Sequence, residues 1–180
     1  MASVYKIVIV GPVGAGKTQA VKVLSDIEVV STEAAASDGV RAIKSHTTVA
    51  MDYGVLNLPG GDRVRLYGTP GQERFDFMWE ILSENALGVV LLLDGSARDP
   101  VADLRHYVAA FRHIVDETTL VVGITHLGWG DRTVRPAVAA ELARLGLPAT
   151  VMSVDARERA EMVTLVKTLI YSLNPLHEAS

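Results

Sequence analysis

The fold is decided by Val8-Ile9-Val10-Gly11-Pro12-Val13-Gly14-Ala15-Gly16-Lys17-Thr18, a short apolar run that leads into a glycine-rich segment. The last eight of these residues match G-x-x-x-x-G-K-[ST], the phosphate-loop pattern. A buried strand is expected over residues 5–10 and a helix over 18–24, so the glycines lie between a strand and a helix. Glycines let successive backbone N–H groups point at one anion, and the helix start adds the positive end of its dipole. The stretch therefore predicts a phosphate site, with Lys17 on the outer phosphates and the Thr18 hydroxyl on Mg²⁺.

The bulk properties favour one globular domain. A chain of 180 residues with 49% apolar and 21% charged residues has room for a full core, and we expect a domain over 1–175 with a short tail over 176–180. The net charge of −4 makes nucleic acid and anionic membrane poor candidates as partners. The sequence contains no cysteine, hence no disulfide framework, no thiolate metal site and no acceptor for prenyl or palmitoyl groups. A cytoplasmic protein without a direct membrane anchor is expected.

Strand-like and helix-like periods alternate along the chain, which favours an α/β fold with helices on both faces of the sheet. The pattern predicts a sheet of about six strands that is mostly parallel, with one antiparallel hairpin at Pro59-Gly60-Gly61-Asp62. The strands are expected over 5–10, 49–58, 63–67, 88–93, 120–124 and 149–154. About five helices are expected, over 18–24, 73–86, 100–115, 135–145 and 162–173. The ligand of such a sheet is expected at the carboxyl ends of its strands.

Two further segments carry a family resemblance. Thr69-Pro70-Gly71-Gln72-Glu73-Arg74-Phe75 contains the Gly-Gln-Glu-Arg-Phe run of the Rab second switch. Thr48-Val49-Ala50-Met51-Asp52-Tyr53 is similar to the Rab first-switch segment. With these segments in this order after the phosphate loop, the chain resembles the Ras-like small GTPase superfamily of P-loop NTPases. It looks most like a bacterial branch similar to the gliding-motility and conservon-type GTPases.

The resemblance implies a nucleotide-dependent switch that binds GTP or GDP with Mg²⁺ and hydrolyses GTP slowly. Thr18 and Thr48 would ligate Mg²⁺, although the neighbouring Thr47 is an alternative ligand. The backbone of Gly71 would sense the γ-phosphate, and Gln72 would orient the attacking water. Lys17, Thr48 and Gln72 are then the catalytic candidates. The backbone N–H groups that would hold the phosphates are those of Gly14, Ala15, Gly16, Lys17, Thr18 and Gln19.

The resemblance also implies residues around the base. Thr125-His126-Leu127-Gly128 stands where the family has Asn/Thr-Lys-x-Asp, so Thr125 fits and His126 would cover the base, but the guanine-binding aspartate is missing at 128. Either Asp131, three residues on, or Asp155 is an alternative acceptor. Asp155-Ala156-Arg157 stands where the family has Ser-Ala-Lys, so the N–H of Ala156 is expected on the guanine oxygen.

Two other positions depart from the family pattern. Gly68 stands where most members have the aspartate that holds a metal-bound water. Asp94, at the end of the next expected strand, is the nearest alternative acid, although an aspartate there more often caps the strand end. Val13 stands where Ras-type members have glycine, and its branched side chain predicts slow intrinsic hydrolysis. The partners implied are an exchange factor, effectors and an activating protein, which is roadblock-type by analogy with the bacterial branch.

Two competing functions remain open. The first is a degenerate GTPase-fold module for binding or assembly, with weak, permanent or non-guanine nucleotide binding, and it rests on positions 13, 68 and 128. The second is a P-loop kinase, which the hairpin and the second-switch segment argue against. The affinities for GTP, GDP, ATP and ADP in Mg²⁺ discriminate between them.

Overall fold

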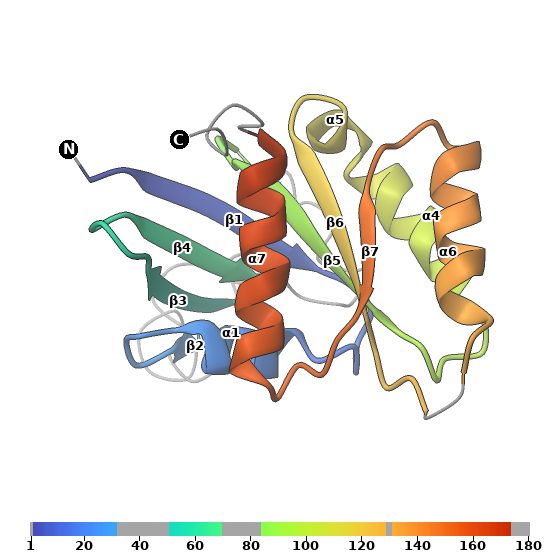
Figure 1. Cartoon of the computed structure of the whole chain (residues 1–180), viewed down its shortest axis with the longest axis horizontal. Coiled ribbons are helices and arrows are strands. Elements are labelled where there is room, and N and C mark those ends of the chain that lie inside the picture. Colours follow the sequence, from blue (N-terminus) through green and yellow to red (C-terminus); the bar gives the residue numbers. More distant parts are fainter. Residues whose placement is uncertain (1, 32–50, 70–83, 129–130, 174–180) are drawn as a thin grey trace, which may run out of the picture.

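The computed structural model describes residues 2–31, 51–69, 84–128 and 131–173. Within these ranges seven strands form one sheet in the order β2-β3-β4-β1-β5-β6-β7, with five helices packed on it (Figure 1). The strands are β1 Val4–Val10, β2 Val30–Ser31, β3 Asp52–Asn57, β4 Arg63–Gly68, β5 Gly88–Asp94, β6 Thr119–Thr125 and β7 Thr150–Ser153. The helices are α1 Lys17–Leu24, α4 Pro100–Ala110, α5 Arg112–Val115, α6 Val134–Arg144 and α7 Arg159–Leu173. The expected α/β fold class is confirmed.

The sheet is mostly parallel and has its hairpin where the sequence predicts it. β1 lies between β4 and β5 and pairs with both in parallel, and β6 and β7 continue the parallel part. β3 and β4 pair antiparallel around the turn that follows Leu58, whose N–H donates to the carbonyl of Asp62 at 2.8 Å. Gly60 and Gly61 both have positive φ there, a conformation that glycine adopts without strain.

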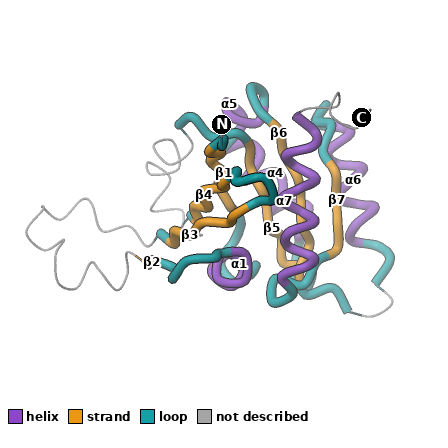
Figure 2. The backbone as a smooth tube through the Cα atoms, turned by 60° about the vertical axis from the view of Figure 1, so that its left-hand side comes forward, coloured by secondary structure: helices purple, strands orange, loops and turns teal. Residues whose placement is uncertain are grey.

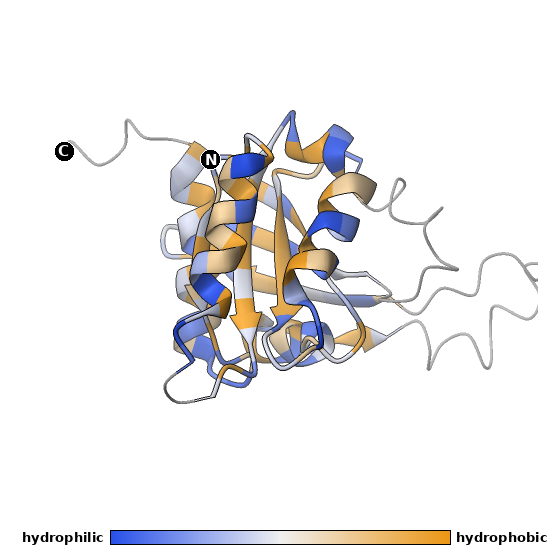
Figure 3. Cartoon of the chain, turned by 90° about the vertical axis from the view of Figure 1, so that its right-hand side faces the viewer, coloured by the Kyte–Doolittle hydropathy of each residue, from blue (hydrophilic) through white to orange (hydrophobic). Residues whose placement is uncertain are grey.

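Alternating side chains of the central strands feed two separate cores. Ile7 and Ile9 of β1 point to the face covered by α1 and α7, whereas Val8 and Val10 point to the face covered by α4, α5 and α6. Figure 2 shows α1 beside β2 and β3, and Figure 3 shows apolar colour on the central strands with polar stretches on the helices. Every residue of β5 from Gly88 to Leu93 is buried, as expected of a strand covered on both faces. In the ranges that the structure describes, none of the helices has the length and hydropathy of a membrane span.

Two expected elements differ from the structure. The helix expected over 100–115 ends at Ala110, and α5 follows after Phe111 as a separate short helix. Phe111 is 1% exposed and lies in the same core as the helices on either side, so the apolar period continues across the break and hides it. The strand expected over 49–58 is shorter as β3, and the two-residue β2 adds a seventh strand. The helix expected over 73–86 lies mostly outside the described residues.

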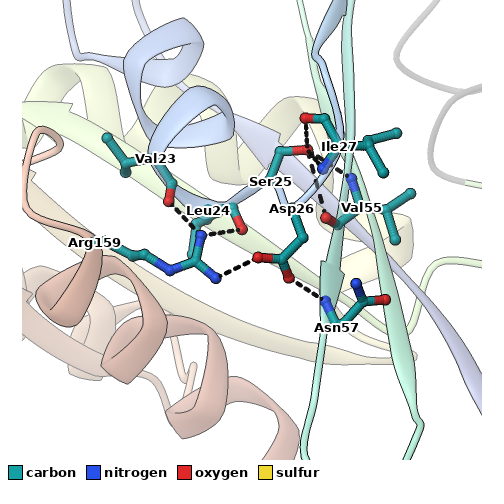
Figure 4. A network of polar contacts seen from close by, with 8 residues as sticks. All are labelled: Val23, Leu24, Ser25, Asp26, Ile27, Val55, Asn57 and Arg159. Atoms are coloured by element: carbon teal, nitrogen blue, oxygen red, sulfur yellow. Dashed lines mark hydrogen bonds and ion pairs between the residues drawn. The ribbon is translucent and has the colours of Figure 1, made fainter.

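The outer edge of β3 is held by polar groups from the end of α1 (Figure 4). The N–H of Val55 donates to Ser25 Oγ at 3.1 Å, and the N–H of Asn57 donates to Asp26 Oδ2 at 2.7 Å. Arg159 at the start of α7 donates to Asp26 Oδ1 at 2.8 Å and also to the carbonyls of the last α1 residues. Because these bonds satisfy backbone groups of β3, they fix its register against α1 and α7.

Candidate nucleotide-binding site

The candidate site residues lie where the parallel strands end. The loop after β1 holds the phosphate pattern, and the ends of β4, β5, β6 and β7 lead to Thr69, Asp94, His126 and Asp155. Since parallel strands have their carboxyl ends at one edge of the sheet, these loops meet beside the start of α1 (Figure 1). The sheet order changes direction next to β1, which is the place where open α/β sheets bind ligands.

The phosphate loop needs glycine at two positions where the backbone comes close to its neighbours. A Cβ on Gly11, whose φ is +146°, would lie 2.0 Å from the carbonyl oxygen of Leu92 in β5. A Cβ on Gly16, whose φ is +98°, would lie 2.9 Å from the Cβ of Ala156. The loop therefore packs tightly against β5 on one side and against the loop after β7 on the other. Val13, by contrast, is 67% exposed.

Lys17 is a buried cation turned back onto the loop. Its Nζ donates to the carbonyl oxygens of Gly11 at 2.6 Å and Pro12 at 2.7 Å, and the residue is 8% exposed. Loss of solvent lowers the pKa of Lys17 to about 8, and the negative charge of Asp52 offsets part of this effect. An ammonium has three N–H donors, so one donor remains for a bound anion. An anion would also supply the charge that burial makes costly to leave unpaired.

The hydroxyl of Thr18 meets a carboxylate that sequence reasoning did not select. Thr18 Oγ1 donates to Asp52 Oδ2 at 2.7 Å, and Asp52 opposes Gly68 in the β3–β4 register. A Cβ on Gly68 would lie 3.4 Å from the Cβ of Asp52. Position 68 lacks the family's acid, but Asp52 on the adjacent strand places a carboxylate beside it. The sequence signal was the Met51-Asp52-Tyr53 segment itself, but its cross-strand register cannot be read without the structure.

Two residues at the carboxyl end of β6, the last strand residue Thr125 and the following His126, hold the phosphate loop from the side. Thr125 is 1% exposed, and its hydroxyl lies 2.8 Å from the carbonyl oxygen of Ala15 and 3.1 Å from that of Leu93. His126 has a φ of +55°, an uncommon conformation for a residue other than glycine. Its ring Nε2 lies 3.0 Å from the carbonyl oxygen of Gly14. Thr125 is therefore a loop-positioning residue in this structure, and His126 lies directly against the loop.

The segment after β7 carries a closed ion pair. Asp155 Oδ1 accepts from the backbone N–H and the Nε of Arg157, and Oδ2 accepts from Arg157 Nη2 at 2.8 Å. The side-chain bonds from Arg157, with the backbone bond next, lower the pKa of Asp155 to about 2. Ala156, between them, is 6% exposed and packs toward Gly16. The structure thus brings 155–157 against the phosphate loop, with both carboxylate oxygens of Asp155 engaged.

The other two acids considered from the sequence act locally. Asp131 Oδ1 accepts from the backbone N–H of Thr133 at 3.0 Å, from its hydroxyl at 3.0 Å and from the N–H of Val134 at 3.4 Å, next to the start of α6. These bonds lower the pKa of Asp131. Asp94 Oδ1 accepts from the N–H and the hydroxyl of Ser96, which is the strand-end cap. The other oxygen of Asp94 faces the phosphate loop, 4.0 Å from where a Cβ on Gly14 would lie.

The structure therefore brings together 14–18, 125–126 and 155–157, with Gln19 exposed on α1. Thr48, its alternative Thr47, Gly71 and Gln72 lie outside the described residues, so their roles stay predictions.

Comparisons with known proteins agree with a nucleotide site. The model of a family described as "Conserved hypothetical ATP binding protein" matches residues 27–133, more than half of the chain. A curated protein of Methanocaldococcus jannaschii, named "Uncharacterized protein MJ1339", is 33% identical over 91 residues. That alignment covers 51% of each sequence, so the chain spans about half the length of this relative.

Proposed function

Because the chain belongs to the family described as conserved hypothetical ATP binding proteins, it is a P-loop nucleotide-binding protein, and we propose that it acts as a nucleotide-dependent switch. In this proposal it is a Ras-like GTPase that binds GTP or GDP and hydrolyses GTP slowly. The observation that carries the proposal is Lys17, a buried cation held at the phosphate loop by the carbonyls of Gly11 and Pro12. A buried ammonium without a counter-ion is costly, and a triphosphate supplies that counter-ion.

The residues present fit Mg²⁺ beside the triphosphate. Mg²⁺ prefers oxygen ligands, and the Thr18 hydroxyl and the Asp52 carboxylate lie 2.7 Å apart where α1 begins. Thr18 would hold the ion and Asp52 would support it in place of the acid absent at 68, with Thr48 added from the family resemblance. When bound, the ion supplies positive charge at the outer phosphates.

Hydrolysis in this proposal depends on positioning. Lys17 binds a phosphate oxygen through its remaining N–H, and Gln72 orients the attacking water as in the resembling family. In the resembling family, the γ-phosphate would order the segments that contain Thr48 and Gly71, and hydrolysis would release them. This release is the switch step. The exposed Val13 crowds the water and keeps the rate low. An activating protein, an exchange factor and effectors are the partners that such a cycle requires.

A second candidate follows from the base end of the site. The family description names ATP, and position 128 is glycine where the resembling GTPases have aspartate. An adenine nucleotide, bound for assembly rather than for switching, is therefore the competing function.

The test is direct binding to the purified chain by calorimetry, with GTP, GDP, ATP and ADP, in Mg²⁺ and in EDTA. The proposal predicts Mg²⁺-dependent binding of guanine nucleotides, and faster single-turnover phosphate release from Val13→Gly than from wild type. A preference for ATP would contradict the guanine-nucleotide switch and support the second candidate, an adenine-nucleotide-binding protein. No binding at millimolar nucleotide would refute both, and an unchanged Val13→Gly rate would remove the steric explanation of slow hydrolysis.

A further inference from the structure

The end of β3 that is remote from Asp52 is bonded to the end of α1 (Figure 4). The N–H of Asp26 donates to the carbonyl of Val55 at 2.7 Å, and the N–H of Val55 donates to Ser25 Oγ at 3.1 Å. The N–H of Asn57 donates to Asp26 Oδ2 at 2.7 Å. In the ranges that the structure describes, β2 pairs with only the first two residues of β3. Residues 25 and 26 therefore take the place of a neighbouring strand along the rest of this edge.

Arg159 at the start of α7 connects this contact to a third element. Its Nη2 donates to Asp26 Oδ1 at 2.8 Å, and its Nη1 donates to the carbonyls of Val23 at 2.8 Å and Leu24 at 3.0 Å. These carbonyls belong to the last turn of α1, where backbone acceptors lack a partner within the helix and the helix dipole favours a cation. Because Asp26 gives one oxygen to Arg159 and the other to Asn57, the guanidinium fixes the carboxylate that holds β3.

The face of β3 toward α1 is packed without spare room. A Cβ on Gly54 would lie 2.7 Å from Ser25 Oγ and 3.1 Å from Val21 Cγ1. A Cβ on Gly68, the partner of Asp52 in β4, would lie 3.2 Å from Val21 Cγ2. α1 thus packs directly on the backbone of β3 and β4, and the position of β3 along α1 is set by close contacts as well as by hydrogen bonds.

The two ends of β3 are therefore held at the two ends of α1. Asp52 meets the Thr18 hydroxyl at 2.7 Å where α1 begins, and Asp26 meets β3 where α1 ends. The eight residues of α1 extend over about 12 Å, so the contacts of Arg159 lie well away from the Thr18 hydroxyl. An effect of Arg159 on the surroundings of that hydroxyl must pass through β3 or through α1.

We propose that Arg159 and Asp26 are positioning residues for the Mg²⁺ site. They hold β3 where its Asp52 carboxylate meets the Thr18 hydroxyl. This inference rests on the proposed nucleotide function, in which Asp52 supports the ion beside Thr18. Groups that orient a metal ligand without touching the ion commonly change metal affinity about 10- to 100-fold. Arg159 acts one step further out than Asp52, so its loss raises the Mg²⁺ requirement of triphosphate binding and leaves Mg²⁺-free binding unchanged.

The experiment measures binding of GTP and of ATP by calorimetry over a range of Mg²⁺ concentrations and in EDTA, so the result does not depend on which base is preferred. The proteins are wild type, Arg159→Met, Arg159→Lys, Asp52→Asn and the double variant Arg159→Met/Asp52→Asn, each shown to be folded by urea unfolding. The matched control is Arg112→Met, because Arg112 also donates to a carbonyl at a helix end, that of Leu145, and pairs with a surface carboxylate, Asp116, but packs with the core on the other face of the sheet.

The expected result is that Arg159→Met raises the Mg²⁺ concentration for half-maximal binding about 3- to 10-fold, with the affinity in EDTA unchanged. Arg159→Lys, which keeps the cation without the guanidinium fork, gives a smaller rise in the same direction. The double variant requires no more Mg²⁺ than Asp52→Asn alone, because both changes act through the same carboxylate. Arg112→Met behaves as wild type.

The other outcomes separate this inference from the proposed function. An unchanged Mg²⁺ requirement in each Arg159 variant that folds would reduce the contact to a structural link and overturn the inference. Equal weakening in Mg²⁺ and in EDTA, or an additive rise in the double variant, would also overturn it, since the effect would then bypass Asp52. An unchanged requirement in Asp52→Asn would overturn it while leaving the nucleotide site in place. Absence of nucleotide binding by wild type would refute the proposed function and this inference with it.

Discussion

Replacing Lys17 with methionine is expected to stabilise the nucleotide-free protein while it weakens the binding of triphosphates. Lys17 is buried, and desolvation lowers its pKa from 10.5 to about 8. A residue retained for folding alone would not carry this penalty. The opposite signs of the two effects are the signature of a cation kept for an anionic ligand.

The magnitude follows from the pKa and the two carbonyl contacts. A pKa lowered from 10.5 to about 8 corresponds to a penalty of about 3 kcal/mol on the charged form. Methionine removes this penalty but leaves the carbonyls of Gly11 and Pro12 without their donor, which costs about 1–2 kcal/mol. The free energy of unfolding at pH 7 should therefore rise by about 1–2 kcal/mol, or about 2–8 °C in Tm for a chain of this size. Triphosphate affinity should fall about 100-fold.

The pH dependence provides a second readout. Between about pH 8 and 10.5 the unfolded chain keeps a proton on Lys17 that the folded chain has released. The free energy of unfolding of the wild type therefore increases as pH rises through this window. Below pH 8 the destabilisation caused by burying the charged Lys17 is constant. The variant lacks this gain, so its advantage over the wild type should disappear by pH 10.5.

The assay is urea unfolding of wild type, Lys17→Met and Lys22→Met at pH 7 and at intervals to pH 10.5, with calorimetric binding of GTP and ATP. Lys22 is an exposed lysine on the same helix and serves as the matched control, with an expected change within about 0.5 kcal/mol. A less stable Lys17→Met protein that still binds triphosphate would show that Lys17 is kept for folding and not for an anionic ligand.

Three further substitutions test other parts of the site. Asp52→Asn should raise the Mg²⁺ concentration needed for half-maximal triphosphate binding about tenfold without changing the affinity in EDTA. The control Asp62→Asn, in the hairpin turn, should leave both quantities unchanged, and equal Mg²⁺ requirements in the two variants would contradict the metal role of Asp52. Thr125→Val should lower the free energy of unfolding by about 1–3 kcal/mol and weaken nucleotide binding, because the single hydroxyl donor that the buried carbonyls of Ala15 and Leu93 share is lost. Unchanged nucleotide affinity would show that this contact does not support the site. Asp26→Ala should lower the free energy of urea unfolding by about 1–3 kcal/mol, because the backbone N–H of Asn57 in β3 loses its carboxylate acceptor and the end of α1 loses its link to α7. Asp116→Ala, which removes a surface ion pair, should cost at most about 0.5 kcal/mol, and similar losses in the two variants would contradict the register role.

The fold was readable because its strongest signals are local. The continuous apolar run of β5, the Pro59–Asp62 turn and the proline-marked start of α4 each dictate one structure over a few residues. β2 was missed because two residues carry no period. The break at Phe111 was missed because both helices bury the same face, so periodicity alone cannot locate it.

For the site, the sequence predicted the features that depend on neighbouring residues in the chain and missed those that depend on contacts between strands or across turns. The phosphate pattern predicts a loop between strand and helix, and its glycines are required by contacts with β5 and with the loop after β7. Asp52 was missed because its importance depends on lying opposite Gly68 across two strands. The engagement of Asp155 by Arg157 was missed for a different reason, since two oppositely charged residues at this spacing pair only when a turn brings them together.

The most direct test of the switch is single-turnover release of the γ-phosphate from GTP bound to the purified chain, followed in Mg²⁺ and in EDTA. We expect stoichiometric GTP binding, followed in Mg²⁺ by slow release of one phosphate per site. This phosphate release should be absent in EDTA and in Lys17→Met. Tight binding without any phosphate release, even after prolonged incubation, would contradict the hydrolytic switch and favour a binding module. Release that is unaffected by Lys17→Met would contradict the assignment of the phosphate site itself.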